Sequence, residues 1–416
     1  MRQLYSFLLY CLSPYLFFRL WWKGRKLPAY RQRINERFGY GNKTKTHYDV
    51  WIHAVSLGEV IAAIPLIEAL LQKNMQLLIT TMTPTGAEKI QVHFQNRVTH
   101  RYLPYDLPQA LWRFFKFHKP RLGIIMETEL WPNLITIATK KEIPLLLLNA
   151  RLSKRSYDGY KKIKYLFKPL LNKFNLILAQ SPEDASYFKQ LGAKEDRVQI
   201  GGNIKFDLQI PSPNKHLLEF DNYLGKNSIR VIVASTHEGE EQLILARLHQ
   251  LKAHIPNLVL LIAPRHPERF QKVYQLSCKM GYKTGLRSQI KSKISDEDVI
   301  ILDSIGELLT FYKISHYAFI GGSLVPVGGH NVLEPIAMQT PVISGKYTHN
   351  FKAICNALQE ANAIILVDNA DELVSKLIDL HQHQDKRQSL VENATQILNK
   401  NKGTVLRYLH QIDNLL

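Results

Sequence analysis

Cysteine is scarce in this sequence of 416 residues, and the three that occur are widely separated. Cys11, Cys278 and Cys355 are odd in number and follow no C-x-x-C spacing. The sequence therefore predicts neither a disulfide framework nor a zinc site, and a reducing cytoplasm fits best. Short-period repeats and low-complexity tracts are also missing, so ordinary globular domains are expected.

Acidic residues are too few to balance the basic ones. The 35 Asp and Glu residues stand against 54 Lys and Arg residues, which gives a formal net charge of +19. Such an excess indicates work near anions, which could be nucleic acid, phosphorylated small molecules or a membrane surface. We expect no nucleic-acid partner, because the sequence has no helix-turn-helix and no pattern for stacking on single strands.

A clean apolar run long enough to cross a bilayer is missing too. Residues 1–22 are mostly apolar and aromatic, but Pro14 and Arg19 interrupt them, and a comfortable span needs about 20 apolar residues. A basic cluster at 23–33 follows the run, as expected on the cytoplasmic side of a membrane. We therefore expect a membrane anchor, either a marginal span or an interfacial helix. A helix packed on the protein's own body is the alternative.

Short apolar runs alternate with helical stretches from about residue 48 onward. Near-continuous apolar runs of strand length are typical of parallel strands covered on both faces. A first series occupies residues 48–55, 75–82, 121–127, 143–150 and 174–180. A second series occupies residues 230–236, 258–264, 299–304, 316–322 and 340–345. The pattern predicts an α/β fold with two doubly wound, Rossmann-like domains facing a central cleft.

The break between the two series sets the domain boundaries. Residues 206–216 include two prolines and a serine, a composition typical of a linker. The length also suits two domains of roughly 150 to 200 residues each. We expect an anchor at 1–22, a first domain at 23–207, a linker at 208–227 and a second domain at 228–416, the last helix of which could pack back on the first domain.

Strand ends of the second series carry candidate binding residues. Arg265 directly follows the run 258–264 and is either a solvated surface arginine or a phosphate clamp. Gly328 and Gly329 precede a helix, where Asn331 is expected as the N-cap. A glycine loop before a helix N-terminus suits a phosphate as well as simple capping, so both interpretations stay open.

A carboxylate also stands at a strand end of the first series. Gly58 is expected to turn the chain after the run 48–55, which places Glu59 in the first turn of the next helix. A carboxylate there can merely complement the helix dipole, a contribution of about 0.3 to 1 kcal/mol. It can also face the cleft and serve as a general base.

Nine motifs give the chain a more specific likeness. They are SLGE (56–59), TTMTPTG (80–86), YLPYD (102–106), METELWPN (126–133), NARLS (149–153), NIKFD (203–207), STHEGEE (235–241), PRHPERF (264–270) and GGSLVPVGGHNVLEP (321–335). In this order and spacing they resemble the 3-deoxy-D-manno-octulosonic acid (Kdo) transferases of Gram-negative lipopolysaccharide synthesis. The resemblance covers nearly the whole chain, including the apolar and basic N-terminus.

The resemblance implies an activity and a catalytic set. It implies a GT-B glycosyltransferase of the inner membrane's cytoplasmic side, which moves Kdo from CMP-Kdo onto a lipid A precursor, with inversion and without a metal or other cofactor. The first domain would bind the acceptor. Glu59 would be the general base, Glu127 and Lys205 would stabilise the transition state, and Glu129 is a less certain neighbour.

The same resemblance places CMP on the second domain. Its expected contacts are Pro264, Arg265, Ile305, Gly306, Glu307, Asn331, Val332, Leu333 and Glu334, with Val332 contributing backbone only. Positive charge suits this role, because CMP-Kdo, the acceptor phosphates and the membrane surface are all anionic. Two other classes share some of these features: a GT-B enzyme using a UDP-sugar, transferase or epimerase, and a membrane scaffold without catalysis.

Overall fold

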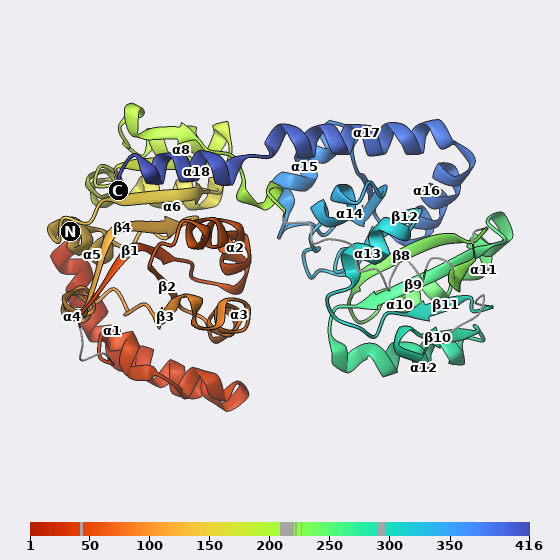
Figure 1. Cartoon of the computed structure of the whole chain (residues 1–416), viewed down its shortest axis with the longest axis horizontal. Coiled ribbons are helices and arrows are strands. Elements are labelled where there is room, and N and C mark those ends of the chain that lie inside the picture. Colours follow the sequence, from red (N-terminus) through yellow and green to blue (C-terminus); the bar gives the residue numbers. More distant parts are fainter. Residues whose placement is uncertain (42–44, 209–219, 221–222, 226, 290–295) are drawn as a thin grey trace. The chain divides into compact units, whose positions relative to one another are not determined.

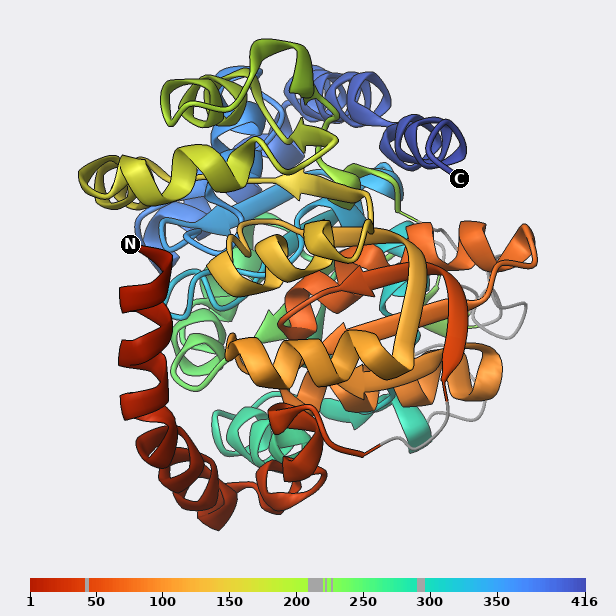
Figure 2. The ribbon, with the colours of Figure 1, turned by 90° about the vertical axis from the view of Figure 1, so that its left-hand side faces the viewer.

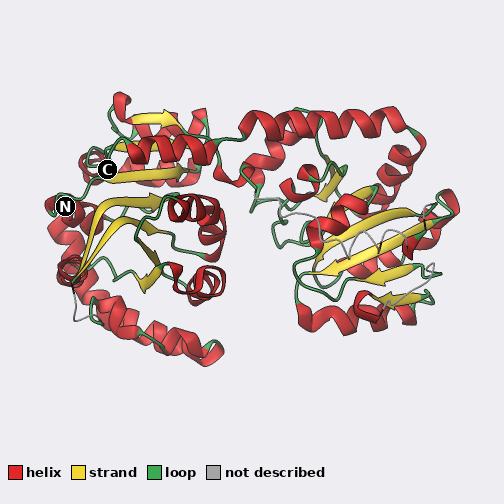
Figure 3. Cartoon of the chain, viewed as in Figure 1, coloured by secondary structure: helices red, strands yellow, loops and turns green. Residues whose placement is uncertain are grey.

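The computed structural model describes residues 1–41, 45–208, 220, 223–225, 227–289 and 296–416. The chain forms two compact units, which we call unit 1 (Met1–Asp207 with Asn401–Leu416) and unit 2 (Leu208–Lys400). Each unit has one seven-stranded sheet, drawn as yellow arrows between red helices in Figure 3. Most of the predicted linker, 208–227, lies outside the described residues.

Unit 1 has the strand order β3-β2-β1-β4-β5-β6-β7, and every neighbouring pair is parallel. The strand order reverses direction between β1 and β4, and such a switch point is where open α/β sheets bind ligands. The strands are β1 (Thr46–His53), β2 (Leu77–Thr81), β3 (Thr99–Tyr102), β4 (His118–Met126), β5 (Leu145–Ala150), β6 (Leu176–Ala179) and β7 (Val198–Ile200).

Unit 2 repeats the design with the order β10-β11-β9-β8-β12-β13-β14, again all parallel. Its switch point lies between β8 and β12. The strands are β8 (Ile229–Thr236), β9 (Leu258–Pro264), β10 (Thr284–Leu286), β11 (Val299–Ile301), β12 (Tyr317–Ile320), β13 (Val342–Gly345) and β14 (Ile365–Val367). The predicted fold class, two doubly wound parallel sheets, is confirmed.

Helices connect the strands in both units. Unit 1 contains α1 (Arg2–Lys26), α2 (Leu57–Gln72), α3 (Pro84–Phe94), α4 (Pro108–Phe117), α5 (Pro132–Lys140), α6 (Lys154–Lys162), α7 (Lys164–Leu171), α8 (Pro182–Gln190) and α18 (Thr404–Asp413). Unit 2 contains α10 (Glu240–Leu245), α11 (Leu248–His254), α12 (Phe270–Lys279), α13 (Leu308–Ile314), α14 (Leu333–Ala337), α15 (Lys352–Glu360) and α16 (Ala370–Gln382); α17 (Gln384–Asn401) leads back to unit 1.

The continuous apolar runs are explained by two cores, one on each face of a sheet. In β5, Leu145 and Leu147 join one buried cluster with α4, α5 and α7. Leu146 and Leu148 join a second cluster with α2, α3 and α18. Successive strand residues point to opposite faces, and both faces of the sheet are covered by helices. Apolar residues are therefore favoured at every position, and the strands lack the polar alternation of a half-exposed strand.

The last helix, α18, packs on unit 1. Figure 1 shows α18 over the strands of this unit, and it contacts α2. The Tyr408 hydroxyl accepts a hydrogen bond from the Asn149 N–H (2.9 Å) and donates to the Gly202 carbonyl (3.0 Å). Asp207, the last residue of the NIKFD motif, accepts from the N–H groups of Gly403 and Val405. The chain therefore passes from one unit to the other and back.

The N-terminal helix α1 runs along the outside of unit 1 (Figure 2). Its inner face is tied down by hydrogen bonds from Ser6 to Asn133 and from the Gln109 N–H to Tyr10. Asp106 caps α5 by accepting from two of its backbone N–H groups. None of the helices in the described part of the chain combines the length and the apolar character that a bilayer span requires.

Candidate active site

Glu59 lies at the switch point of unit 1, in the first turn of α2. Ser56 is the N-cap of this helix. The Glu59 carboxylate accepts from the Val55 N–H (2.9 Å) and from the Ser56 hydroxyl (2.8 Å). Burial raises the pKa of Glu59 to about 7; these two hydrogen bonds oppose the rise, and the charges of Glu127 and Glu129 add to it. The carboxyl group is thus poised between its two protonation states at neutral pH, as a general base requires.

One expectation about this turn is wrong. The sequence predicts that Gly58 forms the turn after β1, but it is the second residue of α2 and does not have a positive φ. Ser56 makes the turn instead, with extended backbone angles (φ −112°, ψ 168°). A Cβ at Gly58 would meet only the Ser56 hydroxyl, at 3.9 Å, so the glycine leaves open space at the start of the helix.

Glu127 follows β4, the other strand at the switch point. Its backbone is in the left-handed region (φ 56°), a conformation that costs a non-glycine residue about 1 to 3 kcal/mol and gathers at functional sites. Glu129 accepts from the Trp131 indole N–H at 2.6 Å, and burial raises its pKa. Two carboxylates thus lie just after β4, and their charges raise the pKa of Glu59.

Lys205 brings a cation to these carboxylates. It sits in a short 3-10 turn, Ile204–Phe206, after β7. Burial lowers the pKa of the Lys205 ammonium, and the charges of Glu127 and Glu59 raise it. The turn is held by Asn149, whose side-chain carbonyl accepts from the Ile204 N–H at 3.1 Å. The structure therefore brings together the four residues expected to be catalytic.

A buried arginine is connected to the same site by a series of hydrogen bonds. Arg37 is 1% exposed, and its guanidinium donates to the Met82 carbonyl at 3.0 Å. The Met82 N–H in turn donates to the Val55 carbonyl (3.0 Å), and Val55 donates to Glu59. The backbone of two residues, Met82 and Val55, thus connects a buried cation to the candidate base.

In unit 2, Arg265 follows β9 and Glu334 lies in the first turn of α14. Burial raises the pKa of Glu334, while Asn331 and the charge of Arg265 lower it. The Asn331 side chain donates to Glu334 (3.0 Å) and accepts from the Leu333 N–H (3.1 Å). The sequence predicts Asn331 as the N-cap, but the N-cap is Val332, so Asn331 closes a turn one residue earlier.

The other residues predicted to contact CMP differ in whether their side chains or only their backbone groups are available to a ligand. Val332 and Leu333 are almost fully buried, which leaves their backbone as the available part. Ile305 is 80% exposed, and Gly306 has a positive φ (89°) with open space around its Cα. Glu307 accepts from the Ser304 hydroxyl. Pro264 is buried at the end of β9, while the Arg265 side chain is exposed.

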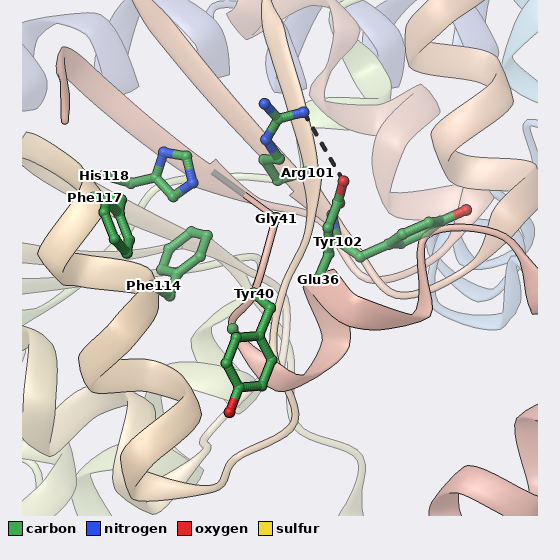
Figure 4. A pocket seen from close by; sticks show the side chains of 9 residues that line it. Glu36, Tyr40, Gly41, Arg101, Tyr102, Phe114, Phe117 and His118 are labelled. Atoms are coloured by element: carbon green, nitrogen blue, oxygen red, sulfur yellow. Dashed lines mark hydrogen bonds and ion pairs between the residues drawn. The ribbon is translucent and has the colours of Figure 1, made fainter. Parts of the chain in front are cut away.

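A separate pocket lies beside β3 and the start of β4 in unit 1 (Figure 4). Arg101 faces Glu36 across it at 3.9 Å. His118, which begins β4, is part of its wall, whereas Glu127 follows the last residue of that strand. Nine residues of strand put His118 about 30 Å from Glu127, and none of the four residues expected to be catalytic lines the pocket. Its lining is Glu36, Gly39, Tyr40, Gly41, Arg101, Tyr102, Phe114, Phe117 and His118.

Comparisons with known proteins agree over the whole chain. A family model described as 3-deoxy-D-manno-octulosonic-acid transferase (kdotransferase) matches residues 32–208, and one for glycosyl transferases group 1 matches residues 228–397. The 3-deoxy-D-manno-octulosonic acid transferase of Haemophilus influenzae is 40% identical, over 98% of this chain and 97% of that protein. The chain belongs to the Kdo transferase family. The Bordetella pertussis transferase is 31% identical over 100% of the chain and 99% of that protein.

Solved structures place the Kdo transferase in a wider fold group. The UDP-GlcNAc 2-epimerase of Neisseria meningitidis has a TM-score of 0.59 at 15% identity, covering 88% of this chain and 100% of that one. A glycosyltransferase from Rickettsia africae has a TM-score of 0.57 at 14% identity, covering 90% and 99%. At such identities the likeness shows the fold alone. With the group 1 match, it confirms the predicted GT-B glycosyltransferase.

Several residues around the Kdo transferase site were not predicted from the sequence. Asn149 and Arg37 contact the segments that hold the residues expected to be catalytic, and Glu240 anchors the glycine loop of unit 2 through three backbone N–H groups. His237 and His330 meet beside that loop. Four of these five stand in or beside the motifs NARLS, STHEGEE and GGHN. A charged or polar residue inside a motif at a strand end was the available signal.

Proposed function

We propose that this Kdo transferase moves Kdo from CMP-Kdo to a lipid A precursor, a phosphorylated and acylated disaccharide, in lipopolysaccharide synthesis. The observation that carries the proposal is the buried Glu59, with a pKa of about 7, beside Lys205 in the unit that the kdotransferase model matches. Incubating the protein with CMP-Kdo, generated in situ, and the tetra-acylated precursor lipid IVA tests it. The mass spectrum must show the acceptor plus one or more Kdo units; unchanged acceptor would refute the assignment.

In the proposed reaction Glu59 takes the proton of an acceptor hydroxyl. The acceptor oxygen forms a bond to the anomeric carbon of Kdo while the bond from that carbon to the CMP phosphate oxygen breaks, and CMP leaves with the electron pair. Attack on the face opposite the leaving group inverts the anomeric centre. Lys205 and Glu127 stabilise the charges that develop in the transition state, a role for fixed charged groups in a partly buried site.

Arg265 and Glu334 are proposed to hold CMP, the arginine through the phosphate and the carboxylate through the ribose hydroxyls. We expect Arg265→Ala and Glu334→Ala each to weaken CMP binding by roughly 10- to 150-fold, because each loses a charge-assisted hydrogen bond of about 1.5 to 3 kcal/mol. Calorimetric titration with CMP measures this. Glu268→Ala, an exposed acidic residue just past β9, is the control. CMP affinity at the parental level in both variants would remove these residues from the site.

The acceptor's acyl chains stay in the bilayer, so the protein is proposed to act at the cytoplasmic face of the inner membrane. The outward side of α1 supports this, because a row of apolar side chains at helical spacing is about half exposed. The row consists of Leu4, Leu8, Leu12, Tyr15, Phe18 and Trp22. Arg25 stacks on Trp21 and Trp22 at its end, an aromatic and basic pairing suited to the interface.

We expect the triple variant Leu8→Gln, Phe18→Gln, Trp22→Gln to lose membrane binding. Removing three half-buried anchors costs about 3 kcal/mol, or roughly a 100-fold drop in partitioning. Flotation with vesicles of anionic lipid measures it. Leu406→Gln, which alters a 71% exposed leucine on α18, is the matched control and should float like the parent. If the triple variant also floats like the parent at high salt, the anchor lies elsewhere.

A further inference from the structure

The STHEGEE motif at 235–241 has no role in the proposed reaction, yet it occupies the switch point of unit 2. His237 directly follows β8, and the glycine loop 321–330 follows β12, the neighbouring strand. In open α/β sheets this position binds ligands. The motif therefore stands where the donor is proposed to bind.

A glycine loop at such a place ordinarily offers free backbone N–H groups to a phosphate, but here an internal carboxylate has taken them. Glu240 accepts from the N–H groups of Gly322 (2.7 Å), Ser323 (3.0 Å) and Leu324 (2.9 Å). The Gly328 and Gly329 N–H groups both donate to the Gly322 carbonyl. At five residues, α14 is also too short to offer a strong dipole. These N–H groups are therefore not available to an anionic ligand, and side chains beside the loop must contribute to holding one.

Two imidazoles cover the loop at this point. The Nε2 atoms of His237 and His330 are 2.9 Å apart, and the rings are nearly parallel (2°) with centroids 5.1 Å apart. Both rings lie against Gly322, where a Cβ would come within 3.1 Å of His330 and 3.3 Å of His237. The His266 ring is 5.5 Å from His237. Glycine is needed here because any side chain would displace the pair.

We propose that the His237–His330 pair binds an oxyanion of the donor, either the CMP phosphate or the carboxylate of the acidic sugar. The proposal rests on the proposed function of unit 2 and adds residues that it does not assign. A 2.9 Å contact between two Nε2 atoms requires one to donate and the other to accept, so the pair shares one proton. If one of the two imidazoles takes up a further proton, both of its nitrogens become donors. The charged ring can then donate a hydrogen bond to an oxyanion.

The surroundings favour proton uptake when an anion binds. Burial, together with the charges of His237, Arg265 and His266, lowers the pKa of His330 to about 4. Burial also lowers the pKa of His237; His266, Arg269 and Arg265 add to this effect and Glu240 opposes it. An anion on the pair offsets the nearby arginines. Each pKa should then rise, and the complex should hold more protons than the free protein.

The test uses the full-length protein and the variants His237→Gln and His330→Gln, which keep a hydrogen-bonding side chain but cannot become charged. His254→Gln, an exposed histidine at the end of α11, is the control. Calorimetry with cytidine and with CMP separates the phosphate from the nucleoside, and the KM for CMP-Kdo tests the carboxylate. A loss of CMP affinity of tenfold or more, with cytidine unchanged, assigns the phosphate. Unchanged CMP affinity with a tenfold higher KM assigns the carboxylate.

Proton uptake gives a second measurement. CMP titrations in two buffers of different ionisation enthalpy report the protons taken up, and the parent should take up more than His330→Gln near pH 7. The difference between the two proteins cancels the titration of CMP itself. Equal uptake in the two proteins would exclude the phosphate as the anion that the pair binds. If neither CMP affinity nor the KM for CMP-Kdo moves more than twofold in either variant, the pair is no oxyanion site. If the parent binds CMP but transfers no Kdo, the proposed function fails while the CMP comparison still decides on the pair.

Discussion

Glu59→Gln should fold like the parent, bind CMP like the parent and transfer Kdo at least about 10² to 10⁴ times more slowly, the range typical of a lost general base. Glutamine keeps the shape of the side chain and can still accept from the Val55 N–H, but it cannot take a proton. Single-turnover rates and melting temperatures measured on one preparation decide the matter. Glu68→Gln, on the same helix but paired with Arg97 at 2.8 Å, serves as the control.

The pH dependence gives the same test a second form. With a pKa of about 7, the parent's kcat/KM should rise as pH increases through 7, because only the ionised carboxylate is a base. The folded pKa lies above the unfolded value, so the Glu59 contribution to stability is full below the unfolded pKa and is lost as pH rises through 7. Glu59→Gln should therefore match the parent in acid and be at least as stable at pH 8. A stable variant within tenfold of the parental rate would return Glu59 to the role of a helix-end charge.

Lys205→Met should lower kcat by about 10² to 10³-fold, the loss expected when one preorganised group that stabilises transition-state charge is removed. Methionine keeps the apolar stem that fills the half-buried turn after β7, so folding should be retained. The KM for the acceptor should change little, because the ammonium acts mainly on charge that develops during transfer.

Two comparisons make the lysine result specific. Lys205→Arg keeps a positive charge and should recover part of the rate, while Lys189→Met removes the charge of a lysine in the last turn of α8 and should leave it unchanged. Steady-state kinetics of all three variants measure these effects. A large rise in KM at constant kcat would mean that Lys205 binds the acceptor instead of stabilising the transition state.

Sequence patterns were sufficient for the inner strands and failed at the sheet edges. All ten predicted runs overlap a strand, but β3, β7, β10 and β14 were missed. These four stand at the ends of the two sheets and have three or four residues each, with partly exposed side chains. An edge strand is paired on one side only and needs less apolar covering, so the continuous apolar signal fades there.

The residues of the candidate sites also differ in whether a local sequence pattern could predict them. Glu59 and Arg265 could be found because they come soon after long apolar strands, whereas Glu127 and Lys205 were indicated only by the family resemblance. The carboxylate of Glu240 could not be predicted as the partner of the loop at 322–324, because more than 80 residues separate them. Its contact depends on β8 and β12 being neighbours, a pairing that no local pattern specifies.

The return of α18 to unit 1 has a consequence for how the protein is made. Most of unit 1 is translated first, but Tyr408, which bonds to the backbone of Asn149 and Gly202, is translated only after unit 2. Until then the apolar face that meets Tyr408 and Ile412 lacks its final cover. Domains usually fold in order of synthesis, yet this one stays unfinished while nearly two hundred further residues of unit 2 are added. A fragment of unit 1 that ends at Asp207 would therefore keep that apolar face exposed.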